Sequence, residues 1–487
     1  MNFTKKTFGL IAGPLCFFAI YFFAKPEGLS EEGLAVLAVT SWVAIWWITE
    51  ALQVEVTALL PIVLFPLSQG LDLSSTCAAY GHKFIFLFVG GFILAIAIEK
   101  WNLHKRIALS IIQLVGTNLN NIILGFMVST AFLSMWISNT ATAVMMLPIG
   151  IAIIKQMGTG NRDSQFGKAL MLAIAYAASI GGMATLIGTP PNIILAGIME
   201  QTFHVELSFG KWFMFGFPIS VVLLLICWKY LTSSAFSFKD IKIEGGKAYI
   251  TEQLRGLGKM RNEEMKVLIV FVFTAALWIC RSIFIKQFIP ALDDTIIAIL
   301  AAVVLFVLPT KEKGRKLMEW KDAVQLPWGV LLLFGGGIAI AEAFDTSGLA
   351  SWIAVHLGSL AGIHLFILLL ALVTCVNFLT EITSNLATAS VLLPVLTPLA
   401  LAMNVHPYAL MVACTLAASC AFMLPVATPP NAIVFGSGYL KIGDMMKAGI
   451  WMNIISIALL TLAVYFLLPL LWDIDINAFP IELKRLK

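Results

Sequence analysis

The stretch Met135–Pro148, MWISNTATAVMMLP, places three polar residues, Ser138, Asn139 and Thr140, in the middle of an apolar run. A near copy, ITSNLATASVLLP, returns at Ile382–Pro394. The two Ser-Asn pairs begin at positions 138 and 384, which are 246 positions apart, and the two Leu-Pro pairs keep the same offset. The chain therefore contains an internal repeat.

The composition indicates a membrane protein. Of the 487 residues, 60% are hydrophobic and 12% are charged, with a mean hydropathy of +0.94, whereas soluble domains carry about 25% charged residues. Long apolar stretches predict about eleven membrane-spanning helices, because each crossing needs roughly 20 apolar residues. The alternating segments of about ten residues that a membrane β-barrel requires are not found in the sequence. We expect an all-α polytopic membrane protein.

The N-terminal apolar run, the cysteines and the histidines do not indicate a catalytic or metal-binding site. The basic start and the apolar run to Ala24 resemble a signal peptide, but the run is long enough to span, so we interpret it as an uncleaved first helix. Seven cysteines are scattered without CxxC spacing, mostly in apolar runs, where cysteine behaves as a small hydrophobic residue. The histidines show no metal-ligand spacing, and we expect no organic cofactor.

Two apolar runs, 121–154 and 364–403, are too long for one simple crossing. A continuous helix of either length would extend about 50 Å, well beyond a hydrocarbon core of about 30 Å. We expect each run to form a re-entrant helical hairpin with its Ser-Asn pair at the tip. Non-helical backbone at this depth is tolerated only where protein buries it or where it lines a water-filled cavity. The tips therefore mark a cavity.

The segments after the hairpins contain paired prolines, in GTPPN at 188–192 and in ATPPN at 427–431. Adjacent prolines remove two backbone donors and clash with the preceding turn, so a helix must break at each. Both breaks are predicted to lie at mid-membrane depth.

The distribution of Lys and Arg predicts the orientation. Basic segments occur at 5–6, 100–106, 155–168, 233–266 and 311–321. All lie on one side, the cytoplasmic one, if each hairpin leaves the membrane where it entered. The N-terminus is then cytoplasmic, and an odd number of crossings places the basic C-terminal tail outside. The hairpins open to opposite sides, and such inverted repeats with broken helices are typical of secondary transporters in the inner (plasma) membrane.

The meeting of tips and breaks would bring together two kinds of ligand. Hydroxyl, amide and carbonyl oxygens suit hard cations such as sodium, whereas free amides at helix N-termini suit anions. Because no Lys or Arg is near the four motifs in the sequence, a bound dianion would need cations to balance its charge. Moving two negative charges inward against about 100 mV costs roughly 4.6 kcal/mol. We therefore expect electrogenic uptake of a dianion with at least two and preferably three sodium ions.

One acidic residue beside the second tip, Glu381, has no counterpart, because Met135 occupies the equivalent position. Intramembrane acids are functional candidates, so a proton or sodium role is one interpretation. We favour the other, in which the carboxylate bonds locally and orients the tip.

The motifs resemble a known family. Ser138-Asn139-Thr140, Thr383-Ser384-Asn385, the two Thr-Pro-Pro-Asn breaks, and ITEAL at 48–52 before TALLP at 57–61 are similar to those of the divalent anion:sodium symporter (DASS) family. That family includes mammalian sodium-coupled dicarboxylate, citrate and sulfate carriers. The resemblance covers essentially the whole chain. It implies a homodimer of eleven-helix protomers, each with a scaffold that dimerises and a transport domain that moves as an elevator.

The resemblance also implies the site residues. A first sodium site would use Ser134, Ser138, Asn139 and the carbonyl of Gly188. A second would use Thr380, Thr383, Asn385 and the carbonyl of Ala427. The substrate carboxylates would contact Ser138, Asn139, Thr140, Thr189, Pro190, Ser384, Asn385, Thr428 and Pro429. Many members have Thr where this chain has Leu386, which leaves the substrate preference open.

We divide the chain accordingly. Residues 1–120 hold the N-terminal helix and the scaffold helices of the first repeat, and 121–233 hold the first hairpin, its broken helix and the following helix. A cytoplasmic linker spans 234–265. Residues 266–360 form the scaffold helices of the second repeat, and 361–487 form the second hairpin, broken helix and last helix. The linker mixes Ile, Leu and Met with charges, so we prefer an interfacial amphipathic helix to a solvated segment.

The predicted function is sodium-coupled uptake of C4 dicarboxylates (succinate, fumarate, malate) across the bilayer. Exchange of dicarboxylates, or sodium-coupled transport of sulfate or citrate, remains open. We expect no enzyme activity and no catalytic residue, because neither an HExxH motif nor a convincing Ser/His/Asp set occurs. A channel would not need two oppositely oriented repeats, and nothing points to nucleic acid.

Overall fold

The computed structural model describes residues 5–116, 118–156, 164–238, 246–312, 314–357 and 362–485. Within these ranges the regular elements are helices, apart from one isolated bridge between Pro309 and Lys316. Seven of the described helices are long and apolar enough to cross a membrane, and five shorter apolar helices accompany them. The all-α polytopic fold is therefore confirmed, while the number of about eleven crossings stays a prediction.

The first part of the chain forms a series of short and long helices. Its members are α1 (Lys5–Phe23), α2 (Glu31–Thr49), α3 (Val54–Thr57), α4 (Leu60–Leu67), α5 (Leu73–Ala79), α6 (Lys83–Lys100) and α7 (Leu103–Val115). α1 packs along α2, and α6 packs along α15 from the second half. The α6–α15 approach is close, because a Cβ on Gly90 would lie 2.5 Å from the carbonyl carbon of Ala298. Glycine at this position is therefore a packing requirement.

Each predicted re-entrant run is split into two helices by a short turn. The first run forms α8 (Leu119–Ser134) and α9 (Asn139–Gln156), and the second forms α19 (Leu365–Thr380) and α20 (Asn385–Ala402). The serine of each Ser-Asn pair explains where the second helix begins. Ser138 Oγ accepts a hydrogen bond from the Ala141 amide over 3.2 Å, and Ser384 Oγ accepts one from Ala387 over 3.1 Å. Both serines thus act as N-caps.

Both predicted helix breaks are present. α10 (Gln165–Gly182) is followed, after an irregular segment, by α11 (Pro190–Phe203), and α21 (Pro407–Ala418) is followed by α22 (Pro429–Phe435). The new helix starts at the first proline in both repeats, where the missing N–H would have had no partner within the helix. The paired prolines therefore end one helix and begin another.

The remaining helices surround these repeats. They are α12 (Phe209–Tyr230), which continues as a π-helical turn at Leu231–Ala235, α13 (Gly246–Gly256), α14 (Asn262–Arg281), a 3-10 turn at Ile285–Gln287, α15 (Asp294–Val307), α16 (Trp320–Ala323), α17 (Trp328–Thr346), α18 (Leu349–His356), α23 (Ile442–Leu462) with a π-helical turn at Ala463–Leu467, α24 (Leu468–Trp472) and α25 (Ile481–Arg485). α13 agrees with the helix expected in the linker, although residues 239–245 lie outside the described part. Its position at a membrane interface stays a prediction.

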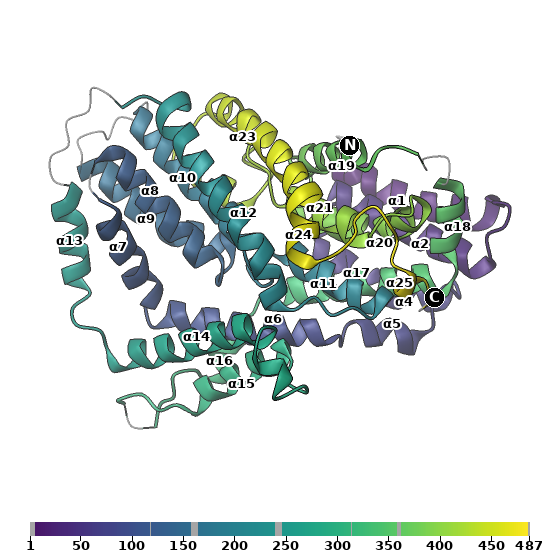
Figure 1. Cartoon of the computed structure of the whole chain (residues 1–487), viewed down its shortest axis with the longest axis horizontal. Helices are drawn as coiled ribbons and strands as arrows, with labels where there is room; N and C mark the ends of the chain where they lie inside the picture. Colours follow the sequence, from purple (N-terminus) through teal and green to yellow (C-terminus); the bar gives the residue numbers. More distant parts are fainter. Residues whose placement is uncertain are drawn as a thin grey trace.

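The two repeats are interlocked through their broken helices. α22 of the second repeat packs on α9 and α10 of the first, while α11 of the first packs on α20 and α21 of the second. α10 and α21 form the centre of this arrangement, and every residue from Phe166 to Gly182 and from Pro407 to Ala418 is buried. In Figure 1, α8 to α10 and α12 lie toward one end, α14 to α16 run beneath them, and α11 lies with α17 to α21 in the half that contains α1 and α2.

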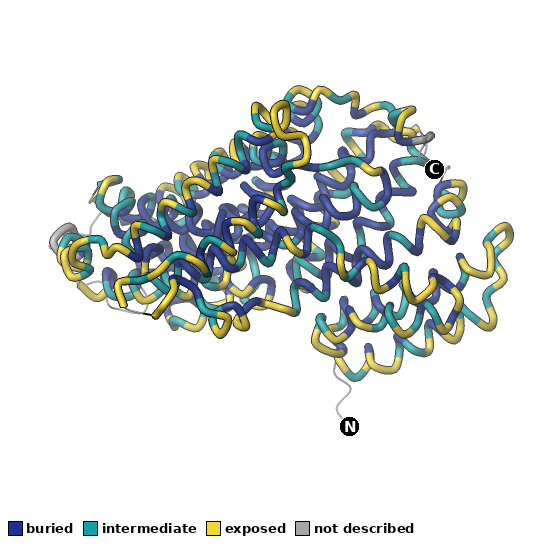
Figure 2. The backbone as a smooth tube through the Cα atoms, turned by 90° about the horizontal axis from the view of Figure 1, so that it is seen from below, coloured by how far each residue is buried: buried dark blue, intermediate teal, exposed yellow. Residues whose placement is uncertain are grey.

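Buried residues fill the interior of the protein, and exposed residues lie along its periphery (Figure 2). Many exposed side chains on α14 and α15 are large and apolar, among them Ile269, Phe273 and Leu300, at 59%, 67% and 55% exposure. Such an apolar outer surface suits contact with lipid hydrocarbon rather than water. The protein is a multi-pass membrane protein.

Candidate functional site

The two hairpin tips and the two breaks meet around one cavity of about 410 Å³. Its wall contains every residue for which the sequence predicts a substrate contact: Ser138, Asn139, Thr140, Thr189, Pro190, Ser384, Asn385, Thr428 and Pro429. These residues come from four separate segments, and only the interlocked packing of the repeats brings them together.

The N-termini of three helices lie on the wall of this cavity. α9 begins at Asn139, α20 at Asn385 and α11 at Pro190, and all three residues lie on the cavity wall. The first amides of α9 and α20 have no partner within their helices, whereas α11 begins with Pro190 and Pro191, which carry no N–H. At all three ends the helix dipole adds a partial positive charge. The cavity is therefore suited to a negatively charged ligand.

The opposite side of the cavity is apolar. It is formed by Phe88 and Phe92 of α6, by Val54 of α3, and by Pro327 and Val330 at the start of α17. The described part of the wall contains no Lys, Arg, Asp, Glu or His. An anion bound here would receive positive charge from helix ends and from bound cations, rather than from a basic side chain.

One basic residue nevertheless lies close to the second tip. Lys5 Nζ donates a hydrogen bond over 3.2 Å to the carbonyl oxygen of Ile382, two positions before Ser384. The expectation that no Lys or Arg lies near the motifs is therefore wrong for the folded protein. Lys5 is remote from Ile382 along the chain, so only the tertiary fold reveals their contact.

An oxygen cluster lies behind the first tip. One end atom of the Asn139 amide lies 2.6 Å from Ser134 Oγ, 3.2 Å from the Ala178 carbonyl oxygen and 3.3 Å from the Gly188 carbonyl oxygen. The Ser134 hydroxyl also donates to the Ala178 carbonyl over 2.6 Å. If the amide oxygen occupies this position, four oxygens converge as ligands for a hard cation. If the nitrogen does, it donates hydrogen bonds to the same oxygens.

The structure thus brings together Ser134, Asn139 and Gly188 of the predicted first sodium site. The Ser138 hydroxyl instead caps α9, and the Ala178 carbonyl joins the cluster without having been predicted. A glycine at 182 is required beside it, because a Cβ there would lie 2.6 Å from Asn139 Oδ1.

A matching cluster lies behind the second tip. The Thr380 hydroxyl lies 2.8 Å from Asn385 Oδ1 and 3.0 Å from the Ala418 carbonyl oxygen. Ala427 lies on the same cavity wall as Asn385. The Thr383 hydroxyl contacts the Leu379 carbonyl and the Thr388 hydroxyl, so it braces the hairpin. Thr380 and Ser134 therefore have equivalent positions and equivalent contacts in the two repeats.

A family profile described as "Sodium:sulfate symporter transmembrane region" matches residues 4–472. The chain belongs to this symporter family. The resemblance to the divalent anion:sodium symporters that the motifs indicated is confirmed.

Relatives of this symporter with nearly full-length similarity carry a transporter name. A protein of Staphylococcus saprophyticus named "Sodium-dependent dicarboxylate transporter SdcS" is 47% identical, over 98% of this chain and 94% of the relative. A protein of the same name from Staphylococcus aureus is 49% identical with the same coverage. These relatives agree with the prediction that the symporter is not an enzyme.

Solved structures of other transporters share the fold of the symporter. Neisseria gonorrhoeae MtrF, described as illuminating a class of antimetabolite efflux pumps, superposes with a TM-score of 0.61 at 14% identity, covering 96% of each chain. The Alcanivorax borkumensis YdaH transporter gives 0.60 at 15% identity, covering 82% of this chain and 89% of its own. At these identities the likeness concerns the fold alone.

Two asparagines that the sequence analysis did not single out hold the breaks of the symporter together. Asn192 Nδ2 donates to the carbonyls of Gly182, Met183 and Thr185, at 3.3, 3.4 and 2.7 Å. Asn431 Nδ2 donates to the carbonyls of Ala421 and Leu424, at 3.2 and 3.0 Å. Both side chains are fully buried. Their presence at the end of both Thr-Pro-Pro-Asn motifs was the available signal.

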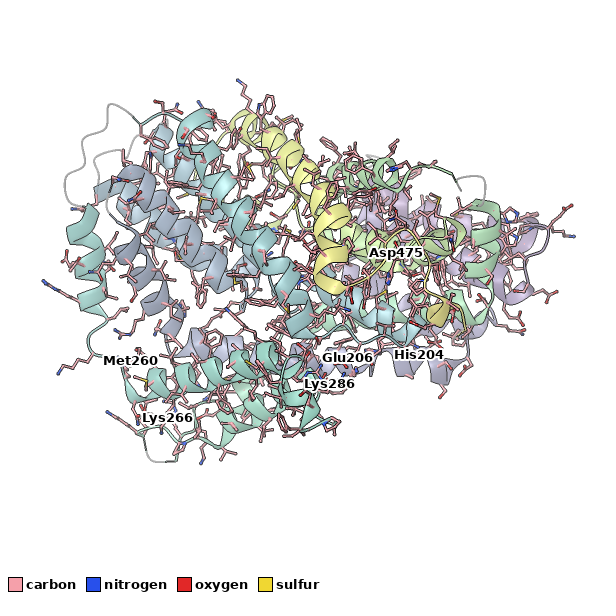
Figure 3. The ribbon with its side chains drawn as sticks, viewed as in Figure 1. His204, Glu206, Met260, Lys266, Lys286 and Asp475 are labelled. Carbon is pink, nitrogen blue, oxygen red and sulfur yellow. The ribbon has the colours of Figure 1, made fainter. Side chains whose placement is uncertain are left out.

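The sequence analysis also missed a group of ion pairs at the far end of α11. The nearly buried Arg281 of α14 pairs with Glu206 in the segment between α11 and α12, and its Nε lies 2.7 Å from Asp294 Oδ1. Lys286 Nζ is 2.9 Å from Glu206 (Figure 3). Burial alone would raise the pKa of Glu206, but hydrogen bonds from Arg281 and Lys286 outweigh it and hold this pKa below its usual value. These pairs tie the segment before α12 to α14 and α15.

Proposed function

We propose that this symporter takes up C4 dicarboxylates such as succinate, fumarate and malate together with sodium ions. One observation carries the proposal: three helix N-termini and two oxygen clusters surround a single cavity. The helix ends favour a dianion, and the clusters favour a hard cation. The name of the relatives, at 47% and 49% identity, supports the same conclusion.

Coupling is proposed to arise because the tips serve both ligands. Asn139 contributes its amide to the first oxygen cluster while the N-terminus of its helix faces the cavity, and Asn385 does the same in the second repeat. Sodium bound in either cluster would fix the tip that holds a substrate carboxylate. It would also supply positive charge that the cavity wall lacks. Substrate would therefore bind tightly only when sodium is bound.

The proposed movement is an elevator in a homodimer located in the inner membrane. The hairpins, broken helices, α12 and α23 would move as the transport domain past a scaffold that contains α6 and α17. The apolar scaffold wall of Phe88, Phe92 and Val330 supports this, because it offers no hydrogen bonds that must break during sliding. If the charge bias sets the orientation, Lys5 and the start of α17 lie on the cytoplasmic side, and the cavity would open toward the cytoplasm.

The cavity favours a dicarboxylate over sulfate as the substrate. Sulfate presents oxygen atoms in every direction, so each would need a donor or a cation. A C4 dicarboxylate has an apolar middle, which Leu386, Phe88 and Phe92 on the wall can contact without leaving polar groups unpaired. Citrate and dicarboxylate exchange remain alternatives that share this geometry.

The test is uptake of labelled succinate, sulfate and citrate into liposomes that contain the purified protein. We expect succinate accumulation driven by a sodium gradient, and none when potassium replaces sodium. Asn139→Ala and Asn385→Ala should each reduce uptake at least tenfold, whereas Asn120→Ala on the exposed start of α8 should not. Normal uptake by both tip variants would refute the site, and succinate counterflow without a sodium requirement would favour exchange.

A further inference from the structure

The two repeats differ immediately behind their tips. In the first repeat, α8 and α10 pack backbone against backbone, because a Cβ on Gly181 would lie 2.3 Å from the Ala131 carbonyl oxygen. Met135 follows α8 there as an apolar, nearly buried residue. In the second repeat, Glu381 occupies the position of Met135. The space between α19 and the second break therefore contains a buried carboxylate, whereas the equivalent position of the first repeat carries an apolar side chain.

Glu381 binds the unwound backbone of the second break rather than the tip itself. Its Oε1 accepts hydrogen bonds from the amides of Phe422 and Met423, at 2.7 and 2.9 Å, and its Oε2 accepts one from Leu424 at 3.0 Å. Asn453 Nδ2 of α23 donates to Oε1 over 2.8 Å. The residue is 3% exposed. The favoured sequence interpretation, that Glu381 bonds locally and orients the tip, is therefore wrong, because its partners belong to the second break and to α23.

Among the residues that the structure describes, only uncharged dipolar groups balance the negative charge of Glu381. All four of its donors there are uncharged N–H groups. A buried carboxylate without a cationic partner is costly in a membrane. Three converging backbone amides lower this cost, but they leave the net negative charge in place.

The surroundings of Glu381 add further oxygen atoms without hydrogen-bond donors. Asn377 Nδ2 donates to the Cys420 carbonyl over 2.7 Å, and the Ser456 hydroxyl donates to the Asn453 carbonyl over 2.9 Å. The amide oxygens of Asn377 and Asn453 have no donor within the described residues, although both side chains are fully buried. The local field is therefore negative, and it lies next in sequence to Thr380, whose hydroxyl belongs to the second oxygen cluster.

We infer that Glu381 is a positioning residue that makes the second sodium site the stronger of the two. It ties the 422–424 backbone to the end of α19, which holds the segment leading to Ala427 against the hairpin before sodium arrives. Its negative charge also favours a cation at Thr380 and Asn385. The first repeat has Met135 at this position. Its break is still tied to the tip, because the Thr185 hydroxyl donates to the Met135 carbonyl over 2.6 Å and accepts from the Gly188 amide over 3.0 Å, but these contacts are uncharged, so the first site lacks the effect of a carboxylate. This inference rests on the proposed sodium-coupled function.

The test compares Glu381→Gln with Met135→Leu in the purified full-length protein. The first readout is thermal stabilisation by sodium in detergent without substrate, and the second is the sodium dependence of succinate uptake. We expect Glu381→Gln to raise the half-maximal sodium concentration at least tenfold in both, with the succinate KM at saturating sodium changed less than about threefold. Glu381→Asp, which keeps the charge, should recover part of the sodium affinity, and Met135→Leu should match wild type.

Two outcomes would overturn the inference. One is that Glu381→Gln leaves the half-maximal sodium concentration unchanged. The other is that its only effect is a lower melting temperature, measured in the absence of sodium. If Glu381→Gln does not fold, Asn453→Ala provides the test, because it releases one side of the carboxylate and should raise the sodium requirement about threefold. An unchanged requirement would then overturn the inference. Absence of any sodium response in wild type would instead refute the proposed function.

Discussion

The Thr380 hydroxyl lies 2.8 Å from Asn385 Oδ1, as the Ser134 hydroxyl lies 2.6 Å from the Asn139 amide in the first repeat. In both repeats the hydroxyl is the last residue of the entering helix and the asparagine is the first of the leaving helix. Each hydroxyl also contacts a carbonyl near the end of the neighbouring helix. The oxygen clusters are thus built by the ends of helices, where carbonyls are free.

Removal of the Thr380 hydroxyl should weaken sodium binding. Thr380→Val keeps the shape and deletes one cluster oxygen, so we expect the sodium concentration for half-maximal succinate uptake to rise about tenfold, which is about 1.4 kcal/mol. Thr374→Val is the matched control, because Thr374 lies partly exposed on the same helix, away from the cavity wall, and its hydroxyl donates to the Leu370 carbonyl. An equal effect of both variants would contradict the cluster.

Loss of the Asn192 amide should destabilise the first break. Asn192→Leu removes a buried donor that contacts three carbonyls. The Met183 carbonyl keeps its hydrogen bond from Trp212, but those of Gly182 and Thr185 lose this donor, at a cost of about 1–3 kcal/mol. We expect a lower melting temperature in detergent, with Asn431→Leu giving a similar loss in the second repeat. Asn120→Ala serves as the exposed control. Wild-type stability in both leucine variants would show that the breaks hold without these amides.

Substitution of Leu386 should change substrate preference. Leu386→Thr adds a hydroxyl donor to the cavity wall, where it can pair with a substrate oxygen that an apolar side chain cannot satisfy. We expect the ratio of sulfate or citrate uptake to succinate uptake to rise about threefold to tenfold, as measured by competition in liposomes. Leu386→Met, which stays apolar, should leave the ratio near that of wild type.

Lys5 should not act as a permanent clamp for the substrate. Its amine donates to a backbone carbonyl at an exposed position, and a typical hydrogen bond contributes a net of only about 0.5–1.5 kcal/mol. We expect Lys5→Met to retain at least half of the succinate uptake at saturating sodium. A loss of more than tenfold would mean that a basic side chain, and not sodium alone, balances the dianion.

Glu206 should stabilise the protein in a pH-dependent way. Because its folded pKa is held below the usual value of 4.5, its contribution is fully present above that value and is lost as the pH falls through the folded pKa. Glu206→Gln should therefore lower the melting temperature at pH 7, by an equivalent of about 1.5–3 kcal/mol. The difference from wild type should shrink toward pH 3, and a constant difference would contradict the ion-pair role.

The sequence by itself determined the elements of the transporter. The composition indicated a helical membrane protein, the two Ser-Asn pairs marked the hairpin tips, and the two Thr-Pro-Pro-Asn motifs marked the breaks. These features depend on local chemistry, since a proline pair ends a helix wherever it occurs and a serine caps the helix that follows it. Their repetition also indicated that the four segments would meet.

Only the tertiary structure decided how the segments share their contacts. The Ala178 and Ala418 carbonyls, the Lys5 contact at the second tip and the ion pairs of Arg281 all join parts of the chain that have no recognisable relation in sequence. The same holds for Glu381, whose carboxylate could have faced the tip, a cation or the break. Backbone carbonyls and amides are present at every position, so which of them are free and converge depends on where helices end in space.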